Sequence, residues 1–382
     1  MIDEAKKKRI LDLVASTRDV DRAQGVELLR AADDRALWER AMGLVRVTHG
    51  AYGDQVQARD LPLLASAPDD LPVVQALRGS TRRMFFSRQL PVGIECLTAL
   101  TDLDVVVESA GTKPRDEPSL SAIAQLRALQ NLTVHGAVLG DGALFRGLSL
   151  RSVTLYNSTW SSLPELDVQI WKAHVSSPST SSLGAGLPRA RHVALSGVAE
   201  LTSLDALARS TSLEVLELDS AAMRAELTPI ASALAGGAPL RRLTMASTPE
   251  LTSLSALSGA SGLEELVLGS APVLSDIEAL AELRALTHLA IRDAAHLPDL
   301  APIARLPALA SLDLRRSAVR DLRPLLSCPA LRVIALSGTA ITPSEVPALL
   351  APYCTWAEEP LLEPLALRRR HPDDTRLETG AR

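Results

Sequence analysis

The side chains best suited to acid–base catalysis or metal binding are the histidines, because imidazole changes charge near neutral pH and readily binds metal ions. They are isolated along this chain, at His49, His135, His174, His192, His288, His296 and His371. The sequence contains no HExxH pattern, no GxxxxGK[ST] phosphate loop and no GxSxG nucleophile elbow. Solvated surface histidines are the favoured interpretation, and we predict no catalytic residue, no cofactor and no metal site.

Cysteine and arginine supply the remaining reactive or anion-binding groups. Cys96, Cys328 and Cys354 are scattered, with no CxxC spacing, which indicates buried or incidental thiols in a reducing compartment. Cys328 lies in LLSCPAL, a context typical of a core thiol, and a nucleophile would need a neighbouring base. The arginines at 368–370 lie in a polar tail just before two aspartates, a pattern typical of a solvated chain end.

Composition limits the classes of partner. The 382 residues are 47% hydrophobic and 3% aromatic, with a net charge of −5. This mild acidity argues against a nucleic-acid partner, which favours a basic surface. The N-terminus lacks the features of a secretory signal, and no apolar run reaches the length of about 18 residues needed to span a membrane. We therefore expect a cytoplasmic protein with no membrane partner; its high Ala, Leu and Arg usage suggests a bacterial genome.

A repeated leucine pattern is the strongest feature of the sequence. ELTSLDALARSTSLEVLELDS, at residues 200–220, has a near copy, ELTSLSALSGASGLEELVLGS, at residues 250–270. Both contain LxxLxL, and the pattern recurs at intervals of 27, 23, 23, 23 and 22 residues, with its first leucine at Leu213, Leu240, Leu263, Leu286, Leu309 and Leu331. The two copies are therefore alternate members of one array.

The same pattern continues less regularly upstream. Its apolar triplets are Thr81/Met84/Phe86, Leu100/Leu103/Val105, Leu129/Leu132/Val134, Leu150/Val153/Leu155, Val168/Trp171/Ala173 and Ala190/Val193/Leu195. In an extended segment, alternate side chains point to the same face, so the second and third apolar positions face a common core. One unit cannot enclose its leucines, but stacked units can share a continuous core.

The chain resembles leucine-rich repeat proteins of the short-repeat type found in internalins and phosphatase regulators. LASLDLRRSAVRDLRPLLSCPA and LRVIALSGTAITPSEVPALL carry this resemblance most clearly, and it covers roughly residues 81–350. It implies an α/β solenoid with a curved parallel sheet on its concave face and short helical, 3₁₀ or irregular segments on its convex face. The family's usual turn asparagine is replaced here, at Ala221, Thr248, Ala271, Ala294, Ser317 and Thr339. Thr and Ser could partly replace the amide, but Ala cannot, so the turn backbone needs water or other backbone groups as partners.

Three regions are expected. Residues 1–80 have apolar residues at helical spacing and are predicted to form an N-terminal helical cap or module. Residues 81–352 are predicted to form the solenoid, and residues 353–382 a cap remnant and polar tail. The stretch TPSEVPALLAPY is expected to form a final helix over the last repeat.

The candidate binding residues lie between the leucines of each strand, where side chains point away from the core. Charges of both signs alternate there, which suits a mixed protein surface. The predicted concave-face set is Glu214, Glu217, Arg241, Arg242, Glu264, Glu265, His288, Arg292, Asp313, Arg315, Arg316 and Arg332.

The resemblance implies a non-enzymatic scaffold that binds another protein, without naming that protein. A first alternative is an enzyme or enzyme regulator with its activity in residues 1–80 and the repeats as a recognition arm. A deep pocket with convergent polar groups in that module would favour this alternative, whereas a simple helical lid would favour the scaffold. A second alternative is a structural or self-assembling element, which an uncapped C-terminal edge would favour.

Overall fold

The computed structural model describes residues 2–50, 53–87, 90, 92–107, 120–174, 183–197, 201–219, 226–297 and 299–356 of the chain. The chain divides into two compact units: unit 1 comprises Met1–Ala221 and Ala225–Ala238, and unit 2 comprises Ala222–Arg224 and Pro239–Arg382. The predicted domain boundary near residue 80 stays a prediction.

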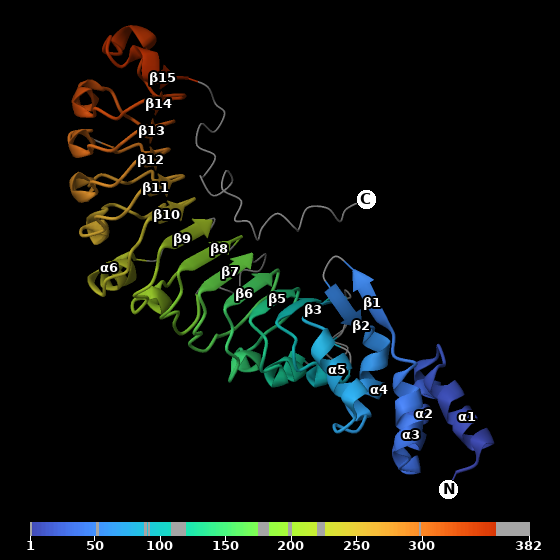
Figure 1. The fold of residues 1–382 in the computed structure, drawn as a ribbon. Coiled ribbons are helices and arrows are strands. Elements are labelled where there is room, and N and C mark those ends of the chain that lie inside the picture. Colours follow the sequence, from blue (N-terminus) through green and yellow to red (C-terminus); the bar gives the residue numbers. More distant parts are fainter. Residues whose placement is uncertain are drawn as a thin grey trace, which may run out of the picture. The chain divides into compact units, whose positions relative to one another are not determined.

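The first part of unit 1 is mainly helical (Figure 1), with α1 (Glu4–Val14), α2 (Asp19–Ala32), α3 (Arg35–Met42), α4 (Leu61–Ser66) and α5 (Pro72–Ser80). Aspartates cap two of these helices: the Asp3 carboxylate accepts a hydrogen bond from the N–H of Lys6, and Asp34 accepts one from Leu37. The predicted helical region is confirmed. An antiparallel pair, β1 (Val47–Gly50) and β2 (Gly53–Val56), interrupts it and was not predicted.

The rest of unit 1 contains seven parallel strands among its described residues, seen side by side in Figure 1. They are β3 (Arg83–Ser87), β4 (Asp102–Val106), β5 (Asn131–His135), β6 (Ser152–Tyr156), β7 (Ile170–His174), β8 (His192–Ser196) and β9 (Val215–Asp219). Each strand pairs with the next in chain order. All six upstream triplets are confirmed, because their second and third positions are buried and lie in register from strand to strand.

Unit 2 repeats this arrangement more regularly. Its strands are β10 (Arg242–Met245), β11 (Glu265–Leu268), β12 (His288–Ile291), β13 (Ser311–Asp313), β14 (Val333–Ala335) and β15 (Cys354–Thr355). Leu243, Leu266, Leu289, Leu312 and Ile334 stand opposite one another across β10–β14, and all are fully buried. Each such side chain stabilises the fold by about 1.5–3 kcal/mol. Because each leucine is covered by those of its neighbours, the core belongs to the stack and not to one coil.

The segments that return from one strand to the next are short, and repeat length explains their geometry. Most contain 3₁₀ turns: η2 (Ile94–Cys96), η3 (Leu120–Gln125), η4 (Ala143–Phe145), η5 (Asp205–Leu207), η6 (Ser255–Leu257), η7 (Glu278–Glu282), η8 (Ile303–Arg305) and η9 (Arg323–Ser327). The 27-residue interval instead holds an α-helix, α6 (Thr228–Ala235). Repeats of 22 or 23 residues leave room for only a 3₁₀ turn, which rises more steeply per residue and stays short.

The expectation of a final helix is wrong. Residues 342–353 form two 3₁₀ turns, η10 (Pro343–Glu345) and η11 (Ala351–Tyr353), and the chain then pairs as β15. Prolines at positions 343, 347 and 352 remove backbone N–H groups and prevent a continuous helix.

Hydroxyl and backbone groups replace the missing asparagines at the turns. The hydroxyls of Thr248, Ser317 and Thr339 donate to the carbonyls of Ser270, Leu314 and Leu336 at 3.0, 2.6 and 2.8 Å. Where the position is Ala271, its N–H donates to the carbonyl of Arg292. The expectation that other backbone groups would serve these turns is confirmed there, whereas Ala221 lies outside the described residues.

Candidate functional site

Four of the predicted residues pair between β10 and β11 on the face of the sheet opposite the core, or at its edge. Arg241 Nη1 donates to Glu264 Oε1 at 3.0 Å, and Arg242 Nε donates to Glu265 Oε2 at 2.8 Å. The first pair is well exposed, with 63% and 52% of its side chains accessible, while Glu265 is buried. The 23-residue repeat places opposite charges side by side, so each pair holds its side chains in a fixed position.

Asp313 on β13 is the centre of a buried ionic network. Arg292 Nε donates to Asp313 Oδ2 at 2.8 Å, and Arg315 donates through Nε and Nη2, with the shortest distance 2.7 Å. Burial alone would raise the pKa of Asp313. Hydrogen bonds from Arg315 and Arg292 outweigh that effect and hold its pKa below the usual value. The carboxylate therefore stays ionised at neutral pH and fixes both guanidinium groups.

Three further predicted residues of unit 2 have separate partners. Arg316 donates to both carboxylate oxygens of Asp293, at 2.6 and 2.9 Å. His288 Nδ1 lies 2.8 Å from the hydroxyl oxygen of Thr287. Arg332 donates to two backbone carbonyls and lies 5.9 Å from the centre of the Tyr353 ring.

The two predicted residues of unit 1 also have cross-strand partners. Glu214 accepts hydrogen bonds from Arg191 Nε and Nη2, at 2.9 and 2.6 Å. Glu217 Oε2 lies 3.3 Å from His192 Nε2.

The structure therefore divides the twelve predicted residues into local groups instead of gathering them in one cluster. Two lie in unit 1 and ten in unit 2. Glu265, Asp313 and Arg315 were expected to be displayed but are buried. Arg242 of the neighbouring repeat covers Glu265, and Asp313 lies between Arg292 of the neighbouring repeat and Arg315 of its own. Arg241, Glu264, Arg316 and Arg332 are exposed.

Sequence reasoning missed a row of planar side chains on unit 1. His135, Tyr156 and His174 stack on neighbouring strands, with ring centroids 4.6 and 5.0 Å apart and interplanar angles of 18° and 4°. His135 Nε2 lies 3.2 Å from Asp104 Oδ1, and His174 Nδ1 contacts the Ser196 hydroxyl. This row, here called the imidazole row, links five strands from β4 to β8. Each member except Asp104 comes directly after the third apolar position of its repeat. An alignment of the repeats would therefore have shown these side chains at one shared position.

The imidazole of His174 favours its neutral form. Partial desolvation by the neighbouring side chains lowers its pKa, and the nearby positive charge of Lys172 lowers it further, while Asp219 acts in the opposite direction. A neutral ring can accept a hydrogen bond from Ser196 at Nδ1 and stack without charge repulsion. The row is therefore uncharged at His174 near neutral pH.

The thiols are poorly suited to nucleophilic chemistry. Burial raises the pKa of Cys96 to about 11 and also raises the pKa values of Cys328 and Cys354. The three thiols are free. Within the described part of the chain, no group of three or more His, Cys, Asp or Glu side chains is placed to hold a metal ion. The arginines at 368–370, His371 and the side chain of His49 lie outside the described residues.

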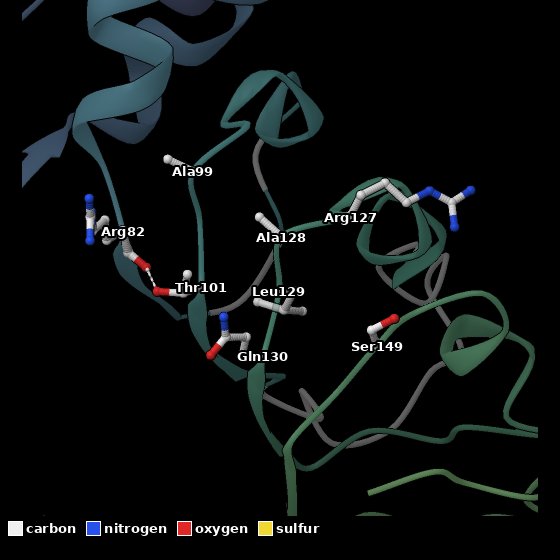
Figure 2. Close-up of a pocket in the computed structure, with 8 residues that line it drawn as sticks. All are labelled: Arg82, Ala99, Thr101, Arg127, Ala128, Leu129, Gln130 and Ser149. Carbon is white, nitrogen blue, oxygen red and sulfur yellow. Dashed lines mark hydrogen bonds between the residues drawn. The ribbon is translucent and has the colours of Figure 1, made fainter.

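A shallow hollow of about 410 Å³ lies where the first strands of the stack begin. Figure 2 shows its two basic residues, Arg82 and Arg127, pointing away from each other. Arg127 donates to the Gly147 carbonyl, and the Thr101 hydroxyl donates to the carbonyl of Arg82 at 3.0 Å. Because its polar groups diverge, this hollow lacks the convergence expected of a ligand site.

A second cavity, of about 280 Å³, lies in the helical region of unit 1. The end of α1, the start of α2, the segment after α3 and the 3₁₀ turn η1 (Ala58–Asp60) form its walls. Its lining comprises Val14, Ala15, Ser16, Arg22, Gly43, Leu44, Val45, Arg46, Arg59 and Asp60. This is a pocket with polar groups in the module where the enzymatic alternative requires one.

None of the helices in the described ranges has the length and apolar character needed to cross a bilayer.

Comparisons with known proteins found solved structures to which this chain is similar. No family model and no curated protein matches the sequence. An internalin from Listeria monocytogenes is 17% identical over 79% of this chain and 95% of its own, with a TM-score of 0.47. A leucine-rich repeat protein of Leptospira interrogans is 16% identical over 71% of this chain and 76% of its own, with a TM-score of 0.44. A chain of the Drosophila Toll–Spätzle complex is 17% identical over 81% of this chain and 49% of its own, with a TM-score of 0.48.

The stacking of LxxLxL strands in parallel register stands on this chain's own sequence and coordinates. This chain therefore has the fold of a leucine-rich repeat solenoid.

Proposed function

We propose that the chain is a non-enzymatic scaffold that binds another protein through the outward sheet face of its repeats, with unit 2 supplying the main contacts. The observation that supports the proposal is a set of ion pairs between neighbouring repeats, at the ends of the strands that form this face. Arg241–Glu264 and Arg316–Asp293 leave charged ends exposed and yet fixed in position. Groups already held in one geometry lose less conformational entropy on binding, which favours specific association.

The buried ionic network around Asp313 supports the proposed scaffold role indirectly. Arg292 and Arg315 are fixed by Asp313, with their side chains only 20% and 6% exposed. They serve mainly to hold β12 and β13 in position, while the exposed pairs make contact. Alternating charge favours a partner whose surface also carries charges of both signs. Like charges that meet across an interface raise the free energy of the complex, so they disfavour association with the wrong proteins.

Charge reversal tests the proposal. The double variant Arg241→Glu/Arg316→Glu changes two exposed guanidinium groups, with 63% and 60% of their side chains accessible. Reversal of Arg315 is unsuitable, because it would disrupt the buried network. The matched control Arg284→Glu/Arg305→Glu makes the same charge change at exposed positions on the return segments.

Proteins retained by immobilised wild-type chain are compared quantitatively with those retained by each variant. We expect at least one protein to be lost with the first double variant and kept with the control. Equal retention by all three would contradict the assignment of the sheet face.

The enzymatic alternative has one observation in its favour, the cavity in the helical region. The self-assembly alternative depends on the chain after position 356, which lies outside the described residues. We also propose a reducing, cytoplasmic compartment, supported by the three free thiols.

A further inference from the structure

The outward face of β5–β8 in unit 1 differs in charge from the strands on either side of it. Each of these four strands has three outward positions, and together they carry His135, His174, His192 and Lys172 and no carboxylate. Acidic side chains lie on the flanking strands, at Asp102 and Asp104 on β4 and at Glu217 and Asp219 on β9. The outward face of β5–β8, here called the central patch, therefore gains positive charge as the pH falls.

The flanking carboxylates already engage two of the three imidazoles. His135 Nε2 lies 3.2 Å from Asp104 Oδ1, and His192 Nε2 lies 3.3 Å from Glu217 Oε2. Charge that forms on these two rings is therefore met within the sheet. Among the residues that the structure describes, no carboxylate lies within ion-pair distance of Lys172 or His174. These two side chains are the ones that a partner can use.

Lys172 and His174 are alternate residues of β7, so both project from the same face of the sheet. His174 Nδ1 contacts the Ser196 hydroxyl, and a neutral ring that accepts a hydrogen bond there carries its proton on Nε2. Within the described ranges, neither that N–H nor the Lys172 ammonium has an acceptor. Lys172 stands in register with Thr154 and Ala194, which are uncharged. β7 therefore presents two neighbouring donors without acceptors.

The groups around His174 determine how an anion would act on it. Tyr156 stacks on the ring from β6, with the ring centroids 5.0 Å apart, and β8 contributes the uncharged Ser196. Partial desolvation and then the charge of Lys172 lower the pKa of His174, while Asp219 on β9 raises it. A carboxylate bound beside Lys172 would offset the repulsion and raise this pKa. Binding would then take up a proton, so a lower pH strengthens it.

We propose that the central patch binds an acidic segment of a partner protein, with a carboxylate held between Lys172 and His174, and binds it more tightly as the pH falls. The inference rests on the proposed scaffold function and names the chemistry that unit 1 recognises. Glutamate side chains have a pKa of about 4.3 and stay ionised above pH 5.5. The carboxylates of β4 and β9 would repel a long acidic run, so the segment is expected to carry few acidic residues.

Titration of the full chain with a short peptide tests the proposal. The probe is acetylated and amidated Gly-Glu-Glu-Gly, and Gly-Gln-Gln-Gly is its uncharged analogue. Proton NMR follows the histidine ring signals at constant ionic strength, and the His174→Asn variant identifies the His174 signal by its loss. We expect a saturable shift of this signal with the acidic peptide alone, and a higher pKa of His174 in the complex. Affinity should rise about threefold from pH 7.5 to 5.5, the size usual for one exposed ion pair.

Substitutions locate the binding. Lys172→Gln is expected to weaken it about threefold, whereas Lys8→Gln removes the same charge from an exposed position of α1 and should not. His174→Asn should remove most of the pH dependence. His296→Asn is its matched control, because His296 is an exposed residue of unit 2. For both histidine variants, affinity is measured from the ring signals of His135 and His192. Circular dichroism checks that each variant is folded.

Four outcomes would overturn the proposal. They are a His174 signal that the acidic peptide does not move, equal affinity for the two peptides, equal weakening by Lys172→Gln and Lys8→Gln, and equal pH dependence in the two histidine variants. The last two would mean that the peptide responds only to the general charge of the chain. Each of the four would leave the assignment of unit 2 in place, since that assignment is tested by the retention of partner proteins.

Discussion

The outward sheet faces of the two units are built on the same strand geometry but are ordered by different interactions. In unit 1, the rings of His135, Tyr156 and His174 stack across neighbouring strands. In unit 2, the corresponding face is ordered by ion pairs, of which Asp313 with Arg292 and Arg315 is the most buried. Neighbouring parallel strands lie about 4.8 Å apart, a spacing that suits stacked rings and paired charges equally well.

The difference shows that a repeat stack specifies its core more strictly than its surface. Buried apolar residues at the second and third positions recur in both units. The outward positions have no such requirement beyond compatibility with the neighbouring strand, so each unit can present its own chemistry.

The largest effect is expected from breaking the ionic centre of unit 2. Asp313→Ala leaves the partly buried guanidinium groups of Arg292 and Arg315 without their shared carboxylate, which should cost about 3 kcal/mol of unfolding free energy. Urea denaturation measures the loss, and amide hydrogen exchange should localise it to β12–β14. Asp321→Ala is the control, because Asp321 pairs with Arg323 on the exposed return segment. A loss no larger than that of the control would show that the network does not hold this face.

A smaller effect is expected in unit 1. Tyr156→Ala removes both ring contacts of the imidazole row and should cost about 1 kcal/mol, with faster amide exchange in β5–β7. Thr154→Ala, on the outward face of the same strand, should change exchange much less. Similar results for the two variants would mean that the stacked rings add nothing beyond their own burial.

The smallest effect is a pH dependence in unit 1. Because the pKa of His174 is lowered, the folded chain binds fewer protons at this site than the unfolded chain. The stabilisation is fully present above the unfolded pKa of about 6.5, and is lost as the pH falls through the folded value. Solvent screens this exposed ring, so the effect should be smaller than that of Tyr156→Ala. Urea denaturation from pH 7.5 to 5 should show a shallower decline for His174→Asn, and an unchanged decline would contradict the assignment.

The strand register could be predicted from the sequence because core leucines recur wherever a strand must bury its inner face. Even the weak triplets around Trp171 and Met84 are correct, since burial at alternate positions tolerates a change of residue type. The 27-residue interval marks the one longer repeat among the regular ones, but the sequence analysis did not assign an α-helix to it. The prolines after position 342 explain why the expected final helix is absent.

The candidate site was less predictable because its properties arise between strands. The spacing placed Asp313 and Arg315 on the outward face, but Asp313 also pairs with Arg292, 21 residues earlier, and Arg315 is buried against Asp313. To predict the imidazole row from the sequence, the repeats would have to be aligned and compared position by position. The cavity of the helical region depends on packing among segments from residue 14 to residue 60, which periodicity does not determine.

Carboxylate footprinting in the presence of a partner tests the central claim most directly. The partner is a protein that the wild-type chain retains and Arg241→Glu/Arg316→Glu loses. We predict that it protects Glu264 and Asp293 from carbodiimide labelling and leaves Glu282 and Asp321, on the return segments, unprotected. Protection confined to carboxylates of the helical region, with Glu264 and Asp293 labelled as in the free chain, would contradict it.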